Sequence, residues 1–194
     1  MRRLDLVVGP NGAGKSTFVR MTLAKSLPST VPFVNADEIA AQRWPSNEQE
    51  HAYQAAEVAA ATRAALIGTG LSFIAETVFS HHSKLELIDA AHVGGYVVFL
   101  HVLLVPLDLT VERVAHRVAA GGHPVPETKI RQRYQRLWPL VAAAMTTADA
   151  ATGYDNSTFA GPRIVAQLAG GTAIGTVGWP DWTPSPLSRR WPNT

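Results

Sequence analysis

Apolar and polar positions along the chain change repeatedly between a strand-like and a helix-like pattern. The strand-like blocks are continuous apolar runs bounded by polar or glycine residues, which is typical of strands covered on both faces of a sheet. A Gly170-Gly171 turn follows the last run and leads into a short edge strand around residues 172–174. Five main strands are predicted, at Leu4–Val8, Val31–Asn35, Leu71–Ala75, Tyr96–Val105 and Arg163–Leu168.

Helical spacing of apolar residues fills the segments between these runs. In the helix expected from Glu127, one stripe is apolar, and Lys129, Arg133 and Arg136 form a cationic stripe on its flank, with Arg131 on the other flank. Pro139 predicts a kink in this helix. Ser46 and Gln49 form a possible capping box, and Asp108 is a possible helix cap. Helices are expected over residues 17–24, 47–67 and 83–91, from residue 108, and from residue 127.

The alternation of strands and helices predicts an α/β fold with three layers, in which helices cover both faces of a mainly parallel, five-stranded sheet. One domain is expected over residues 1–178, followed by an irregular tail, 179–194, that is rich in Pro and Trp and either packs on the body or stays loose. Ligands of such sheets bind outside the carboxyl ends of the strands. The functional residues are therefore expected at that edge of the sheet.

The segment Gly9–Ser16, GPNGAGKS, has the G-x-x-x-x-G-K-S spacing of a P-loop between a predicted strand and a predicted helix. In such a loop, backbone N–H groups and the helix N-terminus surround phosphate groups. Lys15 is expected to reach the β- and γ-phosphates, and Ser16 to bind Mg²⁺. The alternative is a glycine-rich turn that binds nothing. The nucleotide-binding residues are predicted to be Asn11, Gly12, Ala13, Gly14, Lys15, Ser16 and Thr17.

Composition narrows the class of protein. The chain has 17 Lys and Arg, 15 Asp and Glu, and no cysteine, which excludes disulfides and thiolate metal sites and gives little electrostatic support for nucleic-acid binding. No apolar run approaches the roughly 20 residues of a membrane helix, and the N-terminus enters the first strand directly. A soluble, cytoplasmic protein without a membrane or nucleic-acid partner is therefore expected.

The residues around the P-loop favour a small kinase. No LSGGQ-like signature and no apolar strand ending in Asp-Glu is present, which argues against a transporter-type ATPase, and no N-K-x-D string supports a GTPase. Asp37, after the second strand, is expected to act as the base on an acceptor hydroxyl; the alternative is a helix N-cap. Five arginines between residues 113 and 136 predict a lid over the phosphates, although a solvated helix face would show similar spacing.

Five blocks in order are similar to the zeta toxin family of kinases: GPNGAGKSTF, VNADEIA, FIAETVFS, RVAAGGHPVPETKIRQRYQR and YDNS. The match as a whole extends from about Leu4 to Leu168. The resemblance implies ATP and Mg²⁺ as cofactors and phosphate transfer to a hydroxyl of UDP-N-acetylglucosamine or a related UDP-amino-sugar. It also implies a possible antitoxin protein that obstructs nucleotide binding. The chain resembles compact relatives, because it lacks room for the extended substrate-binding insertions of the larger toxins.

The same resemblance assigns roles to individual residues. Lys15 and Ser16 take the phosphate and Mg²⁺ roles, and Asp37 takes that of the catalytic aspartate. Glu76 and Thr77 match positions that contact the sugar substrate; Glu76 could instead be a surface carboxylate or a partner of Arg117. Arg117 matches the first lid arginine, and Arg133 is preferred over Arg131 for the second.

Further alternatives stay open from the sequence. His123 is expected in a turn rather than in catalysis, although its place in the lid keeps a catalytic role open. Asp155 and Asn156 are expected in an Asx-type turn or beside the adenine. A kinase for another acceptor, such as an antibiotic or a free sugar, is an alternative function. A P-loop ATPase or binding module without a phosphorylated product is another.

Overall fold

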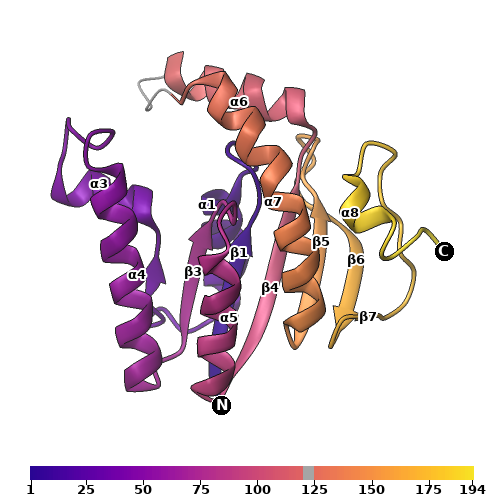
Figure 1. Ribbon diagram of the computed structural model, residues 1–194, viewed down its shortest axis with the longest axis horizontal. Helices are drawn as coiled ribbons and strands as arrows, with labels where there is room; N and C mark the ends of the chain where they lie inside the picture. The colour runs from indigo at the N-terminus through magenta and orange to yellow at the C-terminus, as the bar shows by residue number, and fades with distance from the viewer. Residues whose placement is uncertain (120–124) are drawn as a thin grey trace.

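A seven-stranded sheet runs through the centre of the molecule (Figure 1). The structure, a computed structural model, describes residues 1–119 and 125–194. The strand order is β2-β3-β1-β4-β5-β6-β7, with the first five strands parallel and the last two antiparallel to their neighbours. The strands are β1 (Arg2–Val8), β2 (Phe33–Val34), β3 (Phe73–Thr77), β4 (Tyr96–Leu104), β5 (Ala150–Asp155), β6 (Arg163–Ala169) and β7 (Thr172–Ala173).

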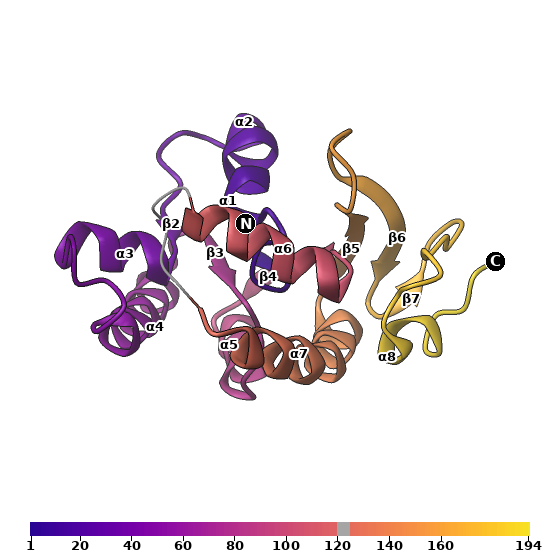
Figure 2. The ribbon, with the colours of Figure 1, turned by 90° about the horizontal axis from the view of Figure 1, so that it is seen from above.

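Helices cover both faces of this sheet, as Figure 2 shows from above. One face is packed against α4, α5 and α7, and the other against the segment that follows the P-loop, where Phe18 and Leu23 are buried. The helical segments are α1 (Lys15–Phe18), the π-helical η1 (Val19–Leu23), α2 (Ala24–Ser26), α3 (Ala36–Arg43), α4 (Ala52–Thr69), α5 (Ser83–Val93), α6 (Leu107–Ala119), α7 (Glu127–Thr147) and α8 (Ser185–Ser188). The three-layer α/β fold predicted from the sequence is confirmed.

The sheet has two strands more than the five predicted. β7 corresponds to the short edge strand expected around residues 172–174, whereas β5 was missed, because only a turn at its end was recognised. Its sequence, Ala150–Asp155, is short of large apolar residues and includes Gly153. A Cβ on Gly153 would lie 2.8 Å from the ring of Trp179, so glycine is needed for the tail to pack there. Pairing with β4 on one side and β6 on the other stabilises a strand that its own residues do not predict.

The expected helices are present, but the residues at which they begin were predicted less accurately. Ser46 and Gln49 do not cap α4, which begins at Ala52; Ser46 instead has a positive φ of 76° in the preceding turn. Asp108 lies within the first turn of α6, one residue after its start. The apolar stripe of α7 is confirmed, because Ile130, Tyr134, Leu137 and Val141 are all buried, and the helix continues through Pro139.

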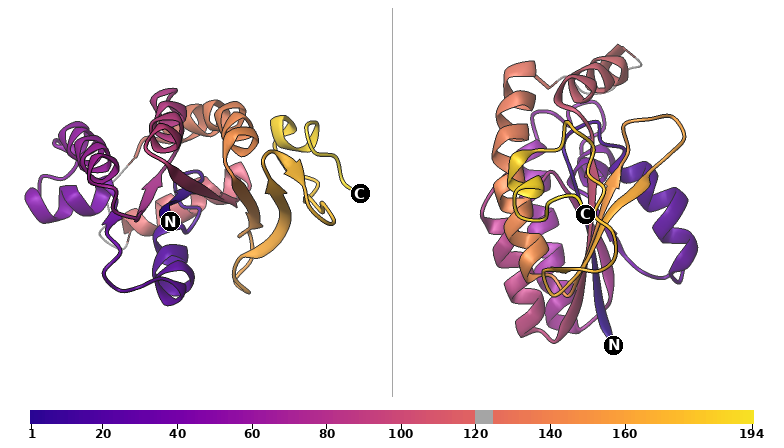
Figure 3. Two further views of the ribbon diagram at one scale, coloured as in Figure 1. Left: turned by 90° about the horizontal axis from the view of Figure 1, so that it is seen from below. Right: turned by 90° about the vertical axis from the view of Figure 1, so that its right-hand side faces the viewer.

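The C-terminal tail packs on the body of the protein (Figure 3). Trp179 and Trp191 are both buried, and the Trp179 indole donates a hydrogen bond of 2.7 Å to the Trp191 carbonyl. The Trp191 indole donates in turn to the Gly171 carbonyl at 3.0 Å. Apart from the single turn α8, the tail is irregular and is held by its large side chains.

Candidate active site

The P-loop turns sharply at the end of β1, and its glycines are required by the fold. A Cβ on Gly9 would lie 2.5 Å from the backbone oxygen of Leu103 in β4. Gly14 precedes α1 with a φ of 81°, a left-handed conformation that favours glycine. The loop therefore lies directly over the carboxyl end of the central strands, where the sequence placed the ligand.

The loop leaves a set of backbone N–H groups open. Ala13 N donates to the Pro10 carbonyl at 3.2 Å, which closes the turn. No described residue accepts a hydrogen bond from the N–H groups of Gly12, Gly14, Lys15 or Ser16. Open N–H groups at the start of a helix form an anion site, and this is the observation expected of a loop that binds phosphate.

Lys15 is buried beside this loop, with 7% of its surface exposed. Its Nζ donates to the Pro10 carbonyl at 3.0 Å and lies 3.9 Å from Glu76 Oε1. Burial lowers the pKa of Lys15, while the negative charges of Glu76 and Asp37 raise it and the positive charge of Arg117 lowers it. Three of the predicted site residues therefore act electrostatically on this one ammonium group.

Glu76 is the acidic centre of the site. It is 9% exposed, and its Oε2 accepts hydrogen bonds from Ser16 Oγ at 2.8 Å and Asn35 Nδ2 at 2.9 Å. Burial raises the pKa of Glu76, while the Lys15 charge and the Ser16 hydrogen bond lower it. Glu76 is thus neither a surface carboxylate nor, within the described part of the chain, a partner of Arg117.

The oxygen atoms around Ser16 fit a magnesium ion. A hydroxyl and a carboxylate in contact are hard ligands of the kind that Mg²⁺ prefers, usually one or two from the protein with substrate phosphates completing the shell. Residues 1–119 and 125–194 contain no group of three or more His, Asp or Glu that would hold a metal by itself. A metal at Ser16 and Glu76 would therefore depend on bound phosphates.

Asn35 joins the second and third strands to the site and was not singled out from the sequence. As the N-cap of α3, it accepts a hydrogen bond on Oδ1 from Asp37 N at 2.8 Å, and its Nδ2 holds Glu76. The capping role considered for Asp37 thus belongs to Asn35, and Asp37 is exposed in the first turn of α3. An Asn at a strand end before an acidic helix turn is the signal that identifies such a cap.

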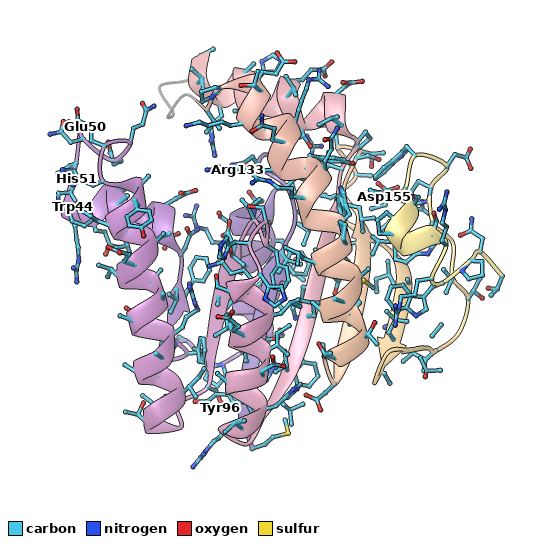
Figure 4. The ribbon with its side chains drawn as sticks, viewed as in Figure 1. Trp44, Glu50, His51, Tyr96, Arg133 and Asp155 are labelled. Carbon is cyan, nitrogen blue, oxygen red and sulfur yellow. The ribbon has the colours of Figure 1, made fainter. Side chains whose placement is uncertain are left out.

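The predicted lid corresponds to α6 and α7. Arg131 is bound to Glu127 at 2.8 Å and to Asp108 at 3.3 Å. Arg133 has no hydrogen-bond or ion-pair partner among the described residues, and Figure 4 shows it extending from α7 toward the side on which α3 lies. Arg117 is exposed on α6. His123 lies outside the described residues.

Two further residues hold the P-loop and were not expected to do so. Asn156, after β5, donates from Nδ2 to the Ala13 carbonyl at 2.8 Å. Arg113 of α6 donates to the Asn156 carbonyl at 3.0 Å and to the Gly12 carbonyl at 3.5 Å. The Asx-type turn is formed by Asp155, which accepts from Ser157 N at 3.0 Å.

Solved structures with the same fold include several kinases and toxin systems. A putative kinase from Chloroflexus aurantiacus is 22% identical with a TM-score of 0.54, covering 68% of this chain and 76% of that chain. The AvrRxo1-ORF1:-ORF2 complex with ATP is 17% identical with a TM-score of 0.69, covering 90% and 60%. The PezAT toxin-antitoxin system of Streptococcus pneumoniae is 15% identical with a TM-score of 0.64, covering 80% and 68%.

At these identities the structural likeness shows the fold alone. The chain spans 60% of the AvrRxo1 chain that it matches. No curated protein matches the sequence. A family model described as an AAA domain does match residues 4–140, which include the P-loop, Asp37, Glu76, all of α6 and the first two-thirds of α7. Because this match covers more than half of the chain, the protein belongs to the AAA domain family AAA_33.

Proposed function

We propose that this protein is a kinase that transfers the γ-phosphate of ATP to a hydroxyl group of a small molecule. The contact of Ser16 and Lys15 with the buried Glu76, beside open P-loop N–H groups, carries the proposal. In this proposal the open N–H groups bind phosphate and the Ser16–Glu76 pair binds a metal, with Asp37 within electrostatic range of both Lys15 and Glu76. The putative kinase among the structural neighbours supports it.

Each residue has a distinct task in the proposed reaction. The P-loop N–H groups and Lys15 bind the phosphates, and a phosphate oxygen competes with the Pro10 carbonyl for the Lys15 ammonium. Ser16 and Glu76 would hold Mg²⁺, which would supply positive charge beside the phosphates. The oxygen of the acceptor hydroxyl bonds to the γ-phosphorus as ADP leaves, and Asp37 accepts the proton that the hydroxyl loses. Arg117 and Arg133 stabilise the charge on the transferred group.

For the acceptor we propose a UDP-amino-sugar such as UDP-N-acetylglucosamine, in a toxin-antitoxin context. The five ordered blocks and the toxin-antitoxin system among the structural neighbours support this choice. Thr77 remains the proposed sugar contact. The hydrogen bonds that Glu76 accepts from Ser16 and Asn35 favour a role on the magnesium side over a direct contact with the sugar.

A test compares ADP formation by the wild-type protein with and without UDP-N-acetylglucosamine. A kinase turns over ATP slowly alone and faster with its acceptor. Lys15→Ala should abolish both rates, while Asp37→Asn should lose the acceptor-dependent rate by roughly 10²–10⁴-fold. An ATP turnover that no acceptor changes would favour the ATPase alternative and contradict the proposal. Acceleration by a free sugar or an antibiotic alone would retain the kinase and replace the acceptor.

A further inference from the structure

The buried face of α4 ends in an arginine without a counter-ion. The buried residues of this helix are Ala55, Ala59 and Arg63, spaced four apart, and Arg63 is only 6% exposed. No carboxylate and no other described residue forms an ion pair or hydrogen bond with its guanidinium. Residues 120–124 contain no Asp or Glu either, so the chain supplies no acid for this charge. Burial lowers the pKa of Arg63, because the charged form is disfavoured away from water.

A second cation, Lys84, lies within electrostatic range of Arg63. Lys84, in the first turn of α5, is half-buried, and its ammonium group has no partner among residues 1–119 and 125–194. Burial lowers the pKa of Lys84, and the positive charge of Arg63 lowers it further. Two like charges placed close together and partly out of water repel each other. An anion between them would remove this repulsion.

The helices that carry these two cations are connected to the edge of the sheet that holds the candidate active site. α4 and α5 are neighbours in the same layer, and both begin at the sheet edge that carries the P-loop (Figure 1). Helical side chains lean toward the helix N-terminus, so Arg63 extends toward that edge, and only the short side chains of Ala59 and Ala55 precede it on its stripe. Lys84 follows the loop that leaves Thr77.

We propose that Arg63 and Lys84 form an anion-binding subsite for a phosphate or diphosphate group of the acceptor. The subsite would favour an acceptor such as a nucleotide sugar over a neutral sugar or a cationic antibiotic, because only an anionic acceptor pairs both charges. The identification of the ligand as the acceptor rests on the proposed kinase function. The binding of an anion by these two residues does not.

Inorganic phosphate is a direct probe of the subsite. The protein is first saturated with Mg²⁺ and a non-hydrolysable ATP analogue, so that the P-loop is filled, and the thermal unfolding midpoint is then followed as phosphate is added. The midpoint of the wild-type protein should rise with phosphate, and Arg63→Met and Lys84→Gln should each lose this rise. Arg189→Gln, on the exposed tail, is the matched control and should respond like the wild type.

A phosphate response that both variants retain would overturn the subsite. Lys84→Gln changes a half-buried side chain and keeps the test valid if Arg63→Met folds poorly. Once an acceptor is known, Arg63→Lys should raise its KM about tenfold with little change in kcat, whereas an unchanged KM would speak against the assignment. If no compound is phosphorylated, the kinase proposal fails while a phosphate response dependent on Arg63 still stands.

Discussion

Asn35 connects two functional groups through one side chain. Its side-chain oxygen, Oδ1, accepts the hydrogen bond from Asp37 N that caps α3, and its side-chain NH₂ group donates a hydrogen bond to Glu76. Both groups of the amide are therefore used, and neither Ala nor Asp can replace both.

Asn35→Ala and Asn35→Asp separate these two tasks. Asn35→Ala loses the cap and should lower the free energy of unfolding by about 1 kcal/mol. Asn35→Asp keeps an acceptor for the cap but places a second carboxylate against Glu76. Both should reduce kinase activity by roughly 10–100-fold, as is usual when the support of a metal ligand is lost. Chemical denaturation and kcat measure the two effects; activity near the wild-type value in both variants would remove Asn35 from the site.

Glu76 should make stability and activity respond to pH in opposite ways. Burial raises the pKa of its folded-state carboxyl above the ordinary 4.5 of a Glu side chain, so the folded protein binds more protons than the unfolded chain across the interval above that pKa. The Glu76 contribution to stability is therefore lost as the pH rises through this interval, whereas metal binding needs the ionised form and gains.

Glu76→Gln tests this predicted direction of the change in stability with pH. The variant should be at least as stable as the wild type at neutral pH, because it removes a buried charge, and it should lose most Mg²⁺-dependent activity. Unfolding curves measured at several pH values should show a weaker fall in stability with rising pH than in the wild type. Glu86→Gln, an exposed acid on α5, is the control and should keep the wild-type profile. If the stability of Glu76→Gln fell more steeply with rising pH than that of the wild type, the raised pKa assigned to Glu76 would be contradicted.

At the scale of elements, α6 and the β5–β6 connection hold the P-loop from behind. The C=O and N–H of a trans peptide point in opposite directions. By binding the Ala13 carbonyl, Asn156 therefore directs the open N–H of Gly14 away from itself and fixes one donor of the phosphate site. Arg113 ties the same loop to the helix that also carries Arg117.

Asn156→Ala should raise the KM for ATP by roughly tenfold, because a freed backbone carbonyl and an unfixed peptide plane together cost about 1–3 kcal/mol. Asn156→Asp should be worse, since its carboxylate would face the Ala13 carbonyl and repel phosphate. Ser157→Ala, next to it in the same connection, is the control. If ATP titrations gave equal affinity for all three variants, the P-loop would keep its conformation without the Asn156 hydrogen bond.

Helices and buried strands were predictable because their apolar residues carry the signal locally. The stripe of α7 and the long strand β4 are examples. β5 was not predictable, because its formation depends on pairing with β4 and β6 and on the fit of Gly153 against Trp179. The same distinction holds in the site. The P-loop and Glu76 were visible in the sequence, but the contacts of Glu76 with residues 41 and 60 positions away, like the Asn156 contact 143 positions away, exist only in the fold.

At the scale of the whole molecule, the fold brings the carboxyl ends of β1, β2 and β3 together and places α6 and the cationic α7 above them. Within the described residues, no helix is long and apolar enough to cross a membrane. The tail, with its buried tryptophans, completes the far edge of the sheet and takes no part in the proposed chemistry.

The central claim is that a phosphoryl group reaches a UDP-sugar and that Asp37 takes the hydroxyl proton. Mass spectrometry of a panel of UDP-sugars, incubated with Mg-ATP and either the wild-type protein or Asp37→Asn, tests it most directly. We expect a UDP-N-acetylglucosamine species heavier by one phosphoryl group with the wild type and none with the variant. ADP formation with every UDP-sugar unchanged, or an equal product from Asp37→Asn, would contradict the account.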